Sequence, residues 1–515
     1  MENLDGALLP TAALALAVVA LVAIAYVATT STGGSKYNLN IPYVDFEDGK
    51  KTTERYARET GSLMKRGYEQ YLKKGLPFAM FNCLELSKPI VILPMKYLAE
   101  VRGASASKLN FPEFMNRSIV AKDILAPLVT ERVVKVAKLD LNKSLNDLIP
   151  AIQETCSSAL TNHLPHSKDY TPQNIQMLFW APISRIMTLV LVGPELKDNE
   201  DWNFLVGGYL LVGQMTAKRV RETYPSWLRW TAKYIDKYVY YIRYFRWKGE
   251  RMLKPLIKDR VADYKKRAAG GGKGKPGFND GIQWLVDSYL ADGEKVKVGS
   301  VMQDMSFLMS ASLHGILMNG VTILYDLVER PEALREIREE IARVEEANGE
   351  KGWNRQSLGS LLALDSFMKE SQRLHTFQHY TMQRIALQDH TFKDGLQIPA
   401  GTWLQMSSRM HGSDPTIVPD GDKFDPMRWK KLRENGDVTK NHFASVHDEM
   451  LPWGSGAHAC PGRFLVQDVL KLIFIHLLSK HDLAFENGER PADWDDNTGT
   501  MPNTGANILV KERVV

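Results

Sequence analysis

A short segment from Pro452 to Phe464, PWGSGAHACPGRF, constrains the fold more than any other part of the chain. Two glycines precede Cys460, Pro-Gly follows it, and an apolar helical pattern begins directly afterwards. Glycines let the backbone turn tightly and bring amide hydrogens close to the sulfur. A helix N-terminus adds free N–H groups and the positive end of the helix dipole. Both effects stabilise a thiolate, the form of cysteine that binds metal, so the segment predicts a metal-binding cysteine at the start of a helix.

Two other interpretations of Cys460 are open at this point. A lone cysteine is more often a buried structural residue. A zinc site is disfavoured because His458-Ala-Cys460 has no second ligand pair at finger-like spacing. The other two cysteines, Cys83 and Cys156, are too distant for a disulfide framework, and such sparse cysteines suit a reducing compartment.

The N-terminal region carries the clearest compositional signal. The stretch from Ala12 to Ala28 contains no charge, and with the apolar residues before Pro10 it approaches the roughly 20 residues that span a bilayer. A cleaved signal peptide would begin with basic residues, whereas Glu2 and Asp5 precede this stretch. Positive charge follows from Lys36 onward, which favours a cytosolic body by the positive-inside rule. The sequence predicts a single N-terminal transmembrane helix.

The remaining chain predicts a mainly α domain with a small β region towards the C-terminus. Its 44% hydrophobic content supports a large core, and its net charge of +5 is too mild and dispersed to indicate nucleic-acid binding. The stretch 270–277 predicts a surface loop, because Pro276 stands where a phosphate loop needs Ser or Thr. Periodicity and turn residues predict helices at 52–74, 301–328, 331–348 and 462–479, a hairpin at 78–95, a strand at 381–392, and turns at 393–395 and 398–401.

The run from Val301 to Val328 is apolar enough to be mistaken for a second membrane span. However, it contains Asp304, His314, Asn319 and Asp326. Scattered polar side chains of this kind favour a central buried helix over a lipid-facing one.

Two further motifs accompany the cysteine segment. Glu370-Ser-Gln-Arg373 would alone be an ordinary helix pair, and Phe424 to Trp429 contains Arg428. In this order and spacing, the three motifs make the chain resemble the cytochrome P-450 haem-thiolate monooxygenases. Within that family it resembles the biosynthetic members of filamentous fungi. The ligand loop of that family has the form Phe-Gly-x-Gly-x-[Arg/His]-x-Cys-x-Gly. The match holds at the glycines, His458 and Cys460, and departs at Trp453, where the family usually has Phe.

The resemblance implies a P-450 fold and a role for each matching residue. Cys460 would be the axial ligand and only metal-binding residue, holding the iron of haem b. His458 and Arg384 would contact the propionates. The remaining residues implied at the cofactor are Trp453, Gly454 and Gly462, and the residues implied in a buried cluster bracing the pocket are Glu370, Arg373 and Arg428.

The resemblance also implies partners and a location. Electrons would come from NADPH through a cytochrome reductase, with cytochrome b5 as a second donor, because the chain has no nicotinamide or flavin fingerprint. Residues 1–30 would anchor the chain in the endoplasmic reticulum membrane in a single pass, 31–51 would form a tether, and 52–515 would form one cytosolic haem-thiolate domain. A lipophilic small molecule would contact segments 110–118, 307–316, 376–382 and 500–506. A basic face for docking the electron donor would comprise Lys135, Lys138, Lys143 and Lys471. An ordinary solvated surface explains these lysines equally well.

One departure from the family concerns catalysis. The family's long helix usually carries an acid–Thr pair that delivers protons during oxygen activation, and here His314 and Gly315 occupy those positions. Either His314, a water or a substrate hydroxyl supplies protons, or the chemistry is diverted to desaturation, ring formation or radical coupling. Rearrangement of a peroxide is a smaller third possibility, and His314 could instead be a core histidine. A haem-binding sensor without turnover and a membrane-anchored scaffold with a degenerate haem site are the alternatives from other functional classes.

Overall fold

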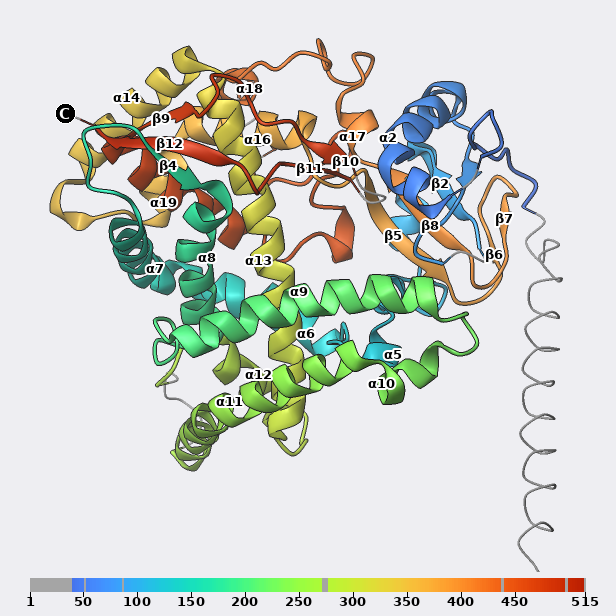
Figure 1. Cartoon of the computed structure of the whole chain (residues 1–515), viewed down its shortest axis with the longest axis horizontal. Helices are drawn as coiled ribbons and strands as arrows, with labels where there is room; N and C mark the ends of the chain where they lie inside the picture. The colour runs from blue at the N-terminus through green and yellow to red at the C-terminus, as the bar shows by residue number, and fades with distance from the viewer. Residues whose placement is uncertain are drawn as a thin grey trace, which may run out of the picture.

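The computed structural model describes residues 39–50, 52–85, 88–270, 277–436, 440–495 and 499–513. The predicted membrane anchor, the first part of the tether and most of the predicted loop at 270–277 lie outside these residues. The described protein is mainly helical, and Figure 1 shows strands both at the right and at the upper left of the helices.

The helices occupy most of the described chain. In order they are α2 (Thr53–Gln70), α3 (Leu98–Gly103), α4 (Phe111–Ser118), α5 (Ala121–Ile124), α6 (Glu131–Val136), α7 (Asn142–His163), α8 (Ile175–Leu191), α9 (Glu200–Thr223), α10 (Ala232–Ile235), α11 (Lys237–Ala269), α12 (Gly281–Ala291), α13 (Val298–Val328), α14 (Pro331–Asn348), α15 (Arg355–Ser360), α16 (Leu362–Leu374), α17 (Arg409–Gly412), α18 (Arg428–Glu434) and α19 (Arg463–Lys480). Single turns of tighter or wider helix are η1 (Leu72–Lys74), η2 (Met95–Tyr97), η3 (Ala137–Leu141), η4 (Arg229–Thr231), η5 (Gly349–Lys351) and η6 (Gly456–His458). The helices predicted at 52–74, 301–328, 331–348 and 462–479 are therefore confirmed.

The strands form one larger sheet and three smaller ones. The five-stranded sheet has the order β1-β2-β8-β5-β3 and the three-stranded sheet the order β4-β12-β9, while β6 pairs with β7 and β10 with β11. Their bounds are β1 (Phe78–Met80), β2 (Ile90–Leu93), β3 (Leu109–Asn110), β4 (Thr171–Asn174), β5 (Tyr380–Ala386), β6 (His390–Thr391), β7 (Gln397–Ile398), β8 (Trp403–Ser407), β9 (His481–Phe485), β10 (Trp494–Asp495), β11 (Thr500–Met501) and β12 (Asn507–Glu512).

The predicted hairpin is confirmed as β1 and β2, and β2 also pairs in parallel with β8. The turns at 393–395 and 398–401 are confirmed, with Gly395 and Gly401 at positive φ. The single strand predicted at 381–392 is wrong, because β5 ends at Ala386 and β6 belongs to another sheet. Residues 387–389 connect the two strands through a bend, so the chain leaves the five-stranded sheet after Ala386.

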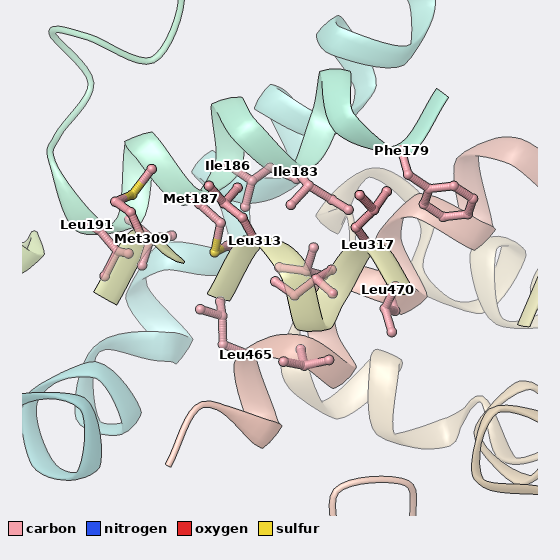
Figure 2. Close-up of a cluster of buried hydrophobic side chains, with 14 of the residues drawn as sticks. Phe179, Ile183, Ile186, Met187, Leu191, Met309, Leu313, Leu317, Leu465 and Leu470 are labelled. Atoms are coloured by element: carbon pink, nitrogen blue, oxygen red, sulfur yellow. The ribbon is translucent and has the colours of Figure 1, made fainter. Parts of the chain in front are cut away.

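The apolar run predicted as a central buried helix is α13, which passes through the middle of the helical layer (Figure 1). Figure 2 shows its Leu313 and Leu317 between side chains of α8 and α19. Its carboxylates are paired, since Asp304 accepts from the Tyr289 hydroxyl and Asp326 from Ser371. Among the described helices α13 alone is long and apolar enough to cross a membrane, but most of that stretch is buried inside the protein.

Two glycines of α13 give a matched test of this packing. A Cβ at Gly320 would lie 2.6 Å from the Phe179 ring, whereas a Cβ at Gly315 would meet nothing within 4 Å. We expect Gly320→Ala to lower the free energy of unfolding, because overpacking costs about 1–3 kcal/mol, more than the roughly 0.5–1 kcal/mol that alanine gains over glycine in a helix. Gly315→Ala should leave stability unchanged or raise it. Chemical denaturation of both variants measures this, and equal destabilisation would contradict the packing of α13.

Candidate functional site

The cysteine segment forms a tight loop that ends at the start of α19. Gly454 and Gly456 adopt positive φ, a conformation that favours glycine. Cys460 N donates to the Trp453 carbonyl at 2.8 Å, which closes the loop upon itself. Gly462 is the residue before the first turn of α19. The local structure expected from the glycines and the following helix is therefore present.

Burial and nearby hydrogen-bond donors have opposite effects on the pKa of the Cys460 thiol. Burial raises the pKa of the thiol, whereas the backbone N–H groups of Gly462 and Arg463 and the Arg463 guanidinium lower it. Cys460 packs against the main core yet is only half-buried, unlike the fully buried Cys156. Burial is the largest of these effects and raises the pKa of the free thiol overall, while the three donors are the groups that would stabilise a thiolate on metal binding.

Arg384 and His458 bring positive charge to the same region. Arg384 lies on β5 and is buried, and its Nη2 has no hydrogen-bond partner among the described residues. Burial lowers the pKa of this guanidinium to about 10. Burial also lowers the pKa of His458, helped by the positive charges of Arg384 and Lys138. The Phe111 ring lies 6.0 Å from the His458 ring and 5.9 Å from the guanidinium carbon of Arg384. A buried cation lacking a full set of partners indicates a place for an anion.

One face of α13 is open although the helix crosses the core. Phe307, Ser310, Ala311, His314 and Gly315 are all half-buried or exposed, and they are spaced along a single helical face. Open space lies beside Gly315, where a Cβ would touch no atom within 4 Å.

His314 reaches across from this face to the segment before β5. Its ring meets the Phe377 ring edge-on, with centroids 5.9 Å apart. Leu313 packs in one cluster with Leu465 of α19 (Figure 2), and α19 begins three residues after Cys460. The open face of α13 and the cysteine loop thus belong to neighbouring elements.

The structure brings Glu370, Arg373 and Arg428 together in a buried cluster. Arg373 Nε and Nη2 donate to the two Glu370 carboxylate oxygens at 2.9 and 2.6 Å, and Arg428 Nε donates to Oε1 at 3.1 Å. The Trp429 indole and the Asp425 backbone N–H complete the shell of Glu370. Arg373 also donates to the Gly412 and Gly421 carbonyls. The cluster fixes an irregular segment of chain to α16.

Comparison with known proteins identifies the family. The cytochrome P450 family model matches residues 243–510. The chain is 35% identical to cytochrome P450 monooxygenase cheE of Chaetomium globosum, over 92% of this chain and 91% of that one. It is also 35% identical to pyrichalasin C-7 hydroxylase of Pyricularia grisea, over 87% of each. The chain belongs to the cytochrome P450 family. A solved structure, retinoic acid bound cyanobacterial CYP120A1, has the same fold, with a TM-score of 0.67 at 15% identity, covering 92% of this chain and all of that one.

Membership implies a haem cofactor and monooxygenase chemistry for this P450, and the residues present fit a haem. The half-buried Cys460 sulfur is a soft donor suited to iron. Arg384, with a nitrogen left unpaired, and His458, with cations beside it, suit the anionic propionates. The small side chains on the open face of α13 leave space beside the helix, since a Cβ at Gly315 would meet nothing within 4 Å.

Some residues singled out in the sequence lie elsewhere. Lys471 does not belong to a docking face, because it is 1% exposed and its Nζ lies 2.6 Å from Asp365 Oδ1. Its place on α19, an almost entirely buried helix, explains the difference. Lys135, Lys138 and Lys143 are exposed.

The segments expected to contact substrate include apolar residues that are buried in the core, among them Leu308, Met382 and Met501. Sequence reasoning did not single out Phe111, which adjoins His458, or Arg463, which binds the Cys460 carbonyl. The position of Arg463 directly after the Cys-Pro-Gly turn was the available signal.

Proposed function

We propose that this P450 is a haem-thiolate monooxygenase that oxidises a lipophilic small molecule, an intermediate of fungal secondary metabolism. The observation that carries the proposal is the Cys460 loop at the start of α19, in which two backbone N–H groups approach the sulfur, together with the contact between α19 and α13, whose one face is open. The names of the relatives support the reaction class, since one is called a C-7 hydroxylase of pyrichalasin.

In this proposal each loop residue has a defined task. Cys460 would hold the iron of haem b through its sulfur, while Arg384 and His458 would bind the propionates. A thiolate-bound haem supplies oxygen activation, because the thiolate donates electron density that favours cleavage of the O–O bond. The two glycines shape the loop, and Trp453 fixes it by donating its indole N–H to the Phe443 carbonyl at 2.8 Å. The Glu370 cluster holds the surrounding segment in place.

Proton delivery falls to side chains on the open face of α13. Ser310 and His314 are one helical turn apart on that face, and His314 occupies the position of the usual acid. Ser312 is unsuited, because its hydroxyl donates to the Leu308 carbonyl. His314 therefore holds the proton, with Ser310 or a bound water extending the path.

Gly315 favours a second candidate outcome. With no hydroxyl at this position and open space beside it, proton delivery is weaker than in a helix that carries Thr. Slow delivery favours desaturation, ring formation or radical coupling of the substrate over hydroxyl transfer.

Electrons in this proposal come from NADPH through a cytochrome reductase, with cytochrome b5 as an additional donor. The exposed Lys135, Lys138 and Lys143 lie within a short stretch that also packs near the cysteine loop, since Asn142 donates to the Pro461 carbonyl. Basic side chains at this place suit an acidic donor protein.

The proposal also places the enzyme on the endoplasmic reticulum membrane, with residues 1–30 as the anchor and 52–515 as one cytosolic domain. Support comes from α9–α11, which lie along one side of the protein (Figure 1). Ten of the 18 exposed large hydrophobic side chains in the described part are found there: Phe204, Leu211, Met215, Trp230, Tyr234, Ile235, Tyr240, Tyr241, Tyr244 and Trp247. Residues 224–258 also contain nine Lys or Arg and two acidic residues. Aromatic rings mixed with basic residues are typical of surfaces at anionic membrane interfaces.

The isotope content of the product tests the reaction class. The full chain is expressed with a reductase, supplied with candidate intermediates under heavy-isotope dioxygen, and compared with Cys460→Ala as the blank. We expect a product that gains one labelled oxygen and is absent from the blank. A product without label, lighter by two hydrogens or dimeric, would contradict oxygen insertion and favour the diverted chemistry.

Restoring the family's hydroxyl tests the role of Gly315. Because open space adjoins this residue, Gly315→Thr should fold and improve proton delivery. We expect more product per electron pair consumed, or a changed product distribution, measured from NADPH consumption, product and released hydrogen peroxide. Unchanged product and unchanged peroxide release would refute the assignment.

A pair of spin labels tests the membrane face. A nitroxide is attached to Tyr241→Cys on α11 or to Leu432→Cys on α18, in the full chain carrying Cys83→Ser and reconstituted in vesicles containing anionic lipid. Both native side chains are exposed, and the two helices lie on opposite sides in Figure 1. Lipid-soluble oxygen should raise the spin relaxation rate of the nitroxide at 241 more than an aqueous nickel complex does. The nitroxide at 432 should show the opposite preference. Equal aqueous access at both positions would contradict the proposal.

A further inference from the structure

Two lysines lie fully buried beneath the cysteine loop, around a single carboxylate. Lys369 of α16 and Lys471 of α19 are each 1% exposed, as is Asp365. Burying an ammonium group is costly, so a methionine of similar length would be cheaper at either position. Such a residue therefore calls for a reason other than stability.

The two lysines have different hydrogen-bond partners. Lys471 Nζ is paired with Asp365 and donates to the Leu358 carbonyl in α15 at 2.9 Å. Lys369 Nζ instead donates to the His442 carbonyl at 3.2 Å and to the Ser445 hydroxyl at 3.0 Å. Lys369 is thus attached to the irregular segment 442–445, which precedes the cysteine loop.

Segment 442–445 is also fixed by Asp365 and by α19. Phe443 N donates to Asp365 Oδ2 at 2.8 Å, and Ala444 N donates to Gln467 Oε1 at 3.2 Å. Phe443 and Ala444 are fully buried. Because the segment has no regular secondary structure, these side-chain contacts determine where its carbonyl groups point.

Those carbonyl groups hold the residues on both sides of Cys460. The Phe443 carbonyl accepts from the Trp453 indole at 2.8 Å, and the Ala444 carbonyl accepts from Arg463 Nε at 3.0 Å. Trp453 and Arg463 then bind the cysteine backbone, since the Trp453 carbonyl accepts from Cys460 N and Arg463 Nη1 donates to the Cys460 carbonyl. A displacement of this one segment would reach Cys460 from both sides.

We propose that Lys369 is a positioning residue for the thiolate: through segment 442–445 it sets the positions of Trp453 and Arg463 and thereby the placement of Cys460. The inference rests on the proposed role of Cys460 as haem ligand. Burial lowers the pKa of Lys369 to about 7, and both its neutral and its charged form can donate these hydrogen bonds. Lys369 directly precedes Glu370, so one turn of α16 fixes both the bracing cluster and the ligand loop.

The test compares Lys369→Met with Lys471→Met in the full haem-loaded chain. Three quantities are measured: the absorption band that thiolate ligation gives the carbon monoxide complex, the rate of haem transfer to a scavenging globin, and the melting temperature. The melting temperature controls for folding: Lys471→Met should lower it, because the buried Asp365 then loses its ammonium partner. Lys369→Met should lose part of the thiolate band and bind haem about 10-fold more weakly, as changes in residues that orient metal ligands commonly do. Lys471→Met should lose less, because Lys471 reaches the segment only through Asp365.

Two outcomes would overturn the proposal: a normal band and normal haem retention in Lys369→Met, or equal losses in Lys471→Met. If Lys369→Met does not fold, Lys369→Arg and Trp453→Phe are used. Trp453→Phe removes the indole donor, and its effect should be less than additive with that of Lys369→Arg, since both changes act on one path. Additive effects would refute the path. Absence of the thiolate band from the unmodified chain would instead refute the proposed function.

Discussion

The hydrogen bonds of the buried Glu370 carboxylate are the interactions on which the segment 412–429 and the neighbouring cysteine loop depend. The carboxylate accepts hydrogen bonds from Arg373, Arg428, the Trp429 indole and the Asp425 backbone, all from buried or half-buried donors. Removing one partner from such a buried charge cluster costs about 3–5 kcal/mol, because the remaining charges are left uncompensated. The segment around 412–429 has little regular secondary structure. These side-chain hydrogen bonds therefore hold it in place of the backbone hydrogen bonds that a sheet would provide. Lys369, one residue earlier, extends the same arrangement to the cysteine loop.

The central helix combines two functions because its faces differ in side-chain size. Leu313 and Leu317 face α8 and α19 and make a dense core (Figure 2). Ser310, Ala311 and Gly315 face the open side, where small side chains leave space beside the helix. Close packing on one face keeps the helix rigid, and in the proposed function the open face would receive the cofactor and the substrate. The same face carries His314, whose ring contacts the Phe377 ring.

The features that the sequence could predict are those encoded locally. The cysteine loop follows from its glycines and the adjoining helix, and α13 follows from the length of its apolar run and its sparse polar residues. Sheet partners were not predictable in the same way, because β2 pairs with β8 from a distant part of the chain. Lys471 was misassigned since its charge suggested a surface, whereas its helix is buried on nearly all sides. The contacts of segment 442–445 carry no sequence pattern, because they depend on α16 and α19 meeting around an irregular stretch. The predicted anchor lies outside the described residues.

The proposed function depends on Cys460 as the ligand of the haem iron, and X-ray absorption at the iron edge tests this most directly. The measurement is made on the haem-loaded full chain and on Cys460→Ser, with Cys83→Ser and Cys156→Ser as controls for the other two cysteines. The account predicts one sulfur neighbour of iron in the unmodified chain and in both controls, and its loss in Cys460→Ser. A spectrum with only nitrogen and oxygen neighbours in the unmodified chain, or a sulfur neighbour that persists in Cys460→Ser, would contradict it.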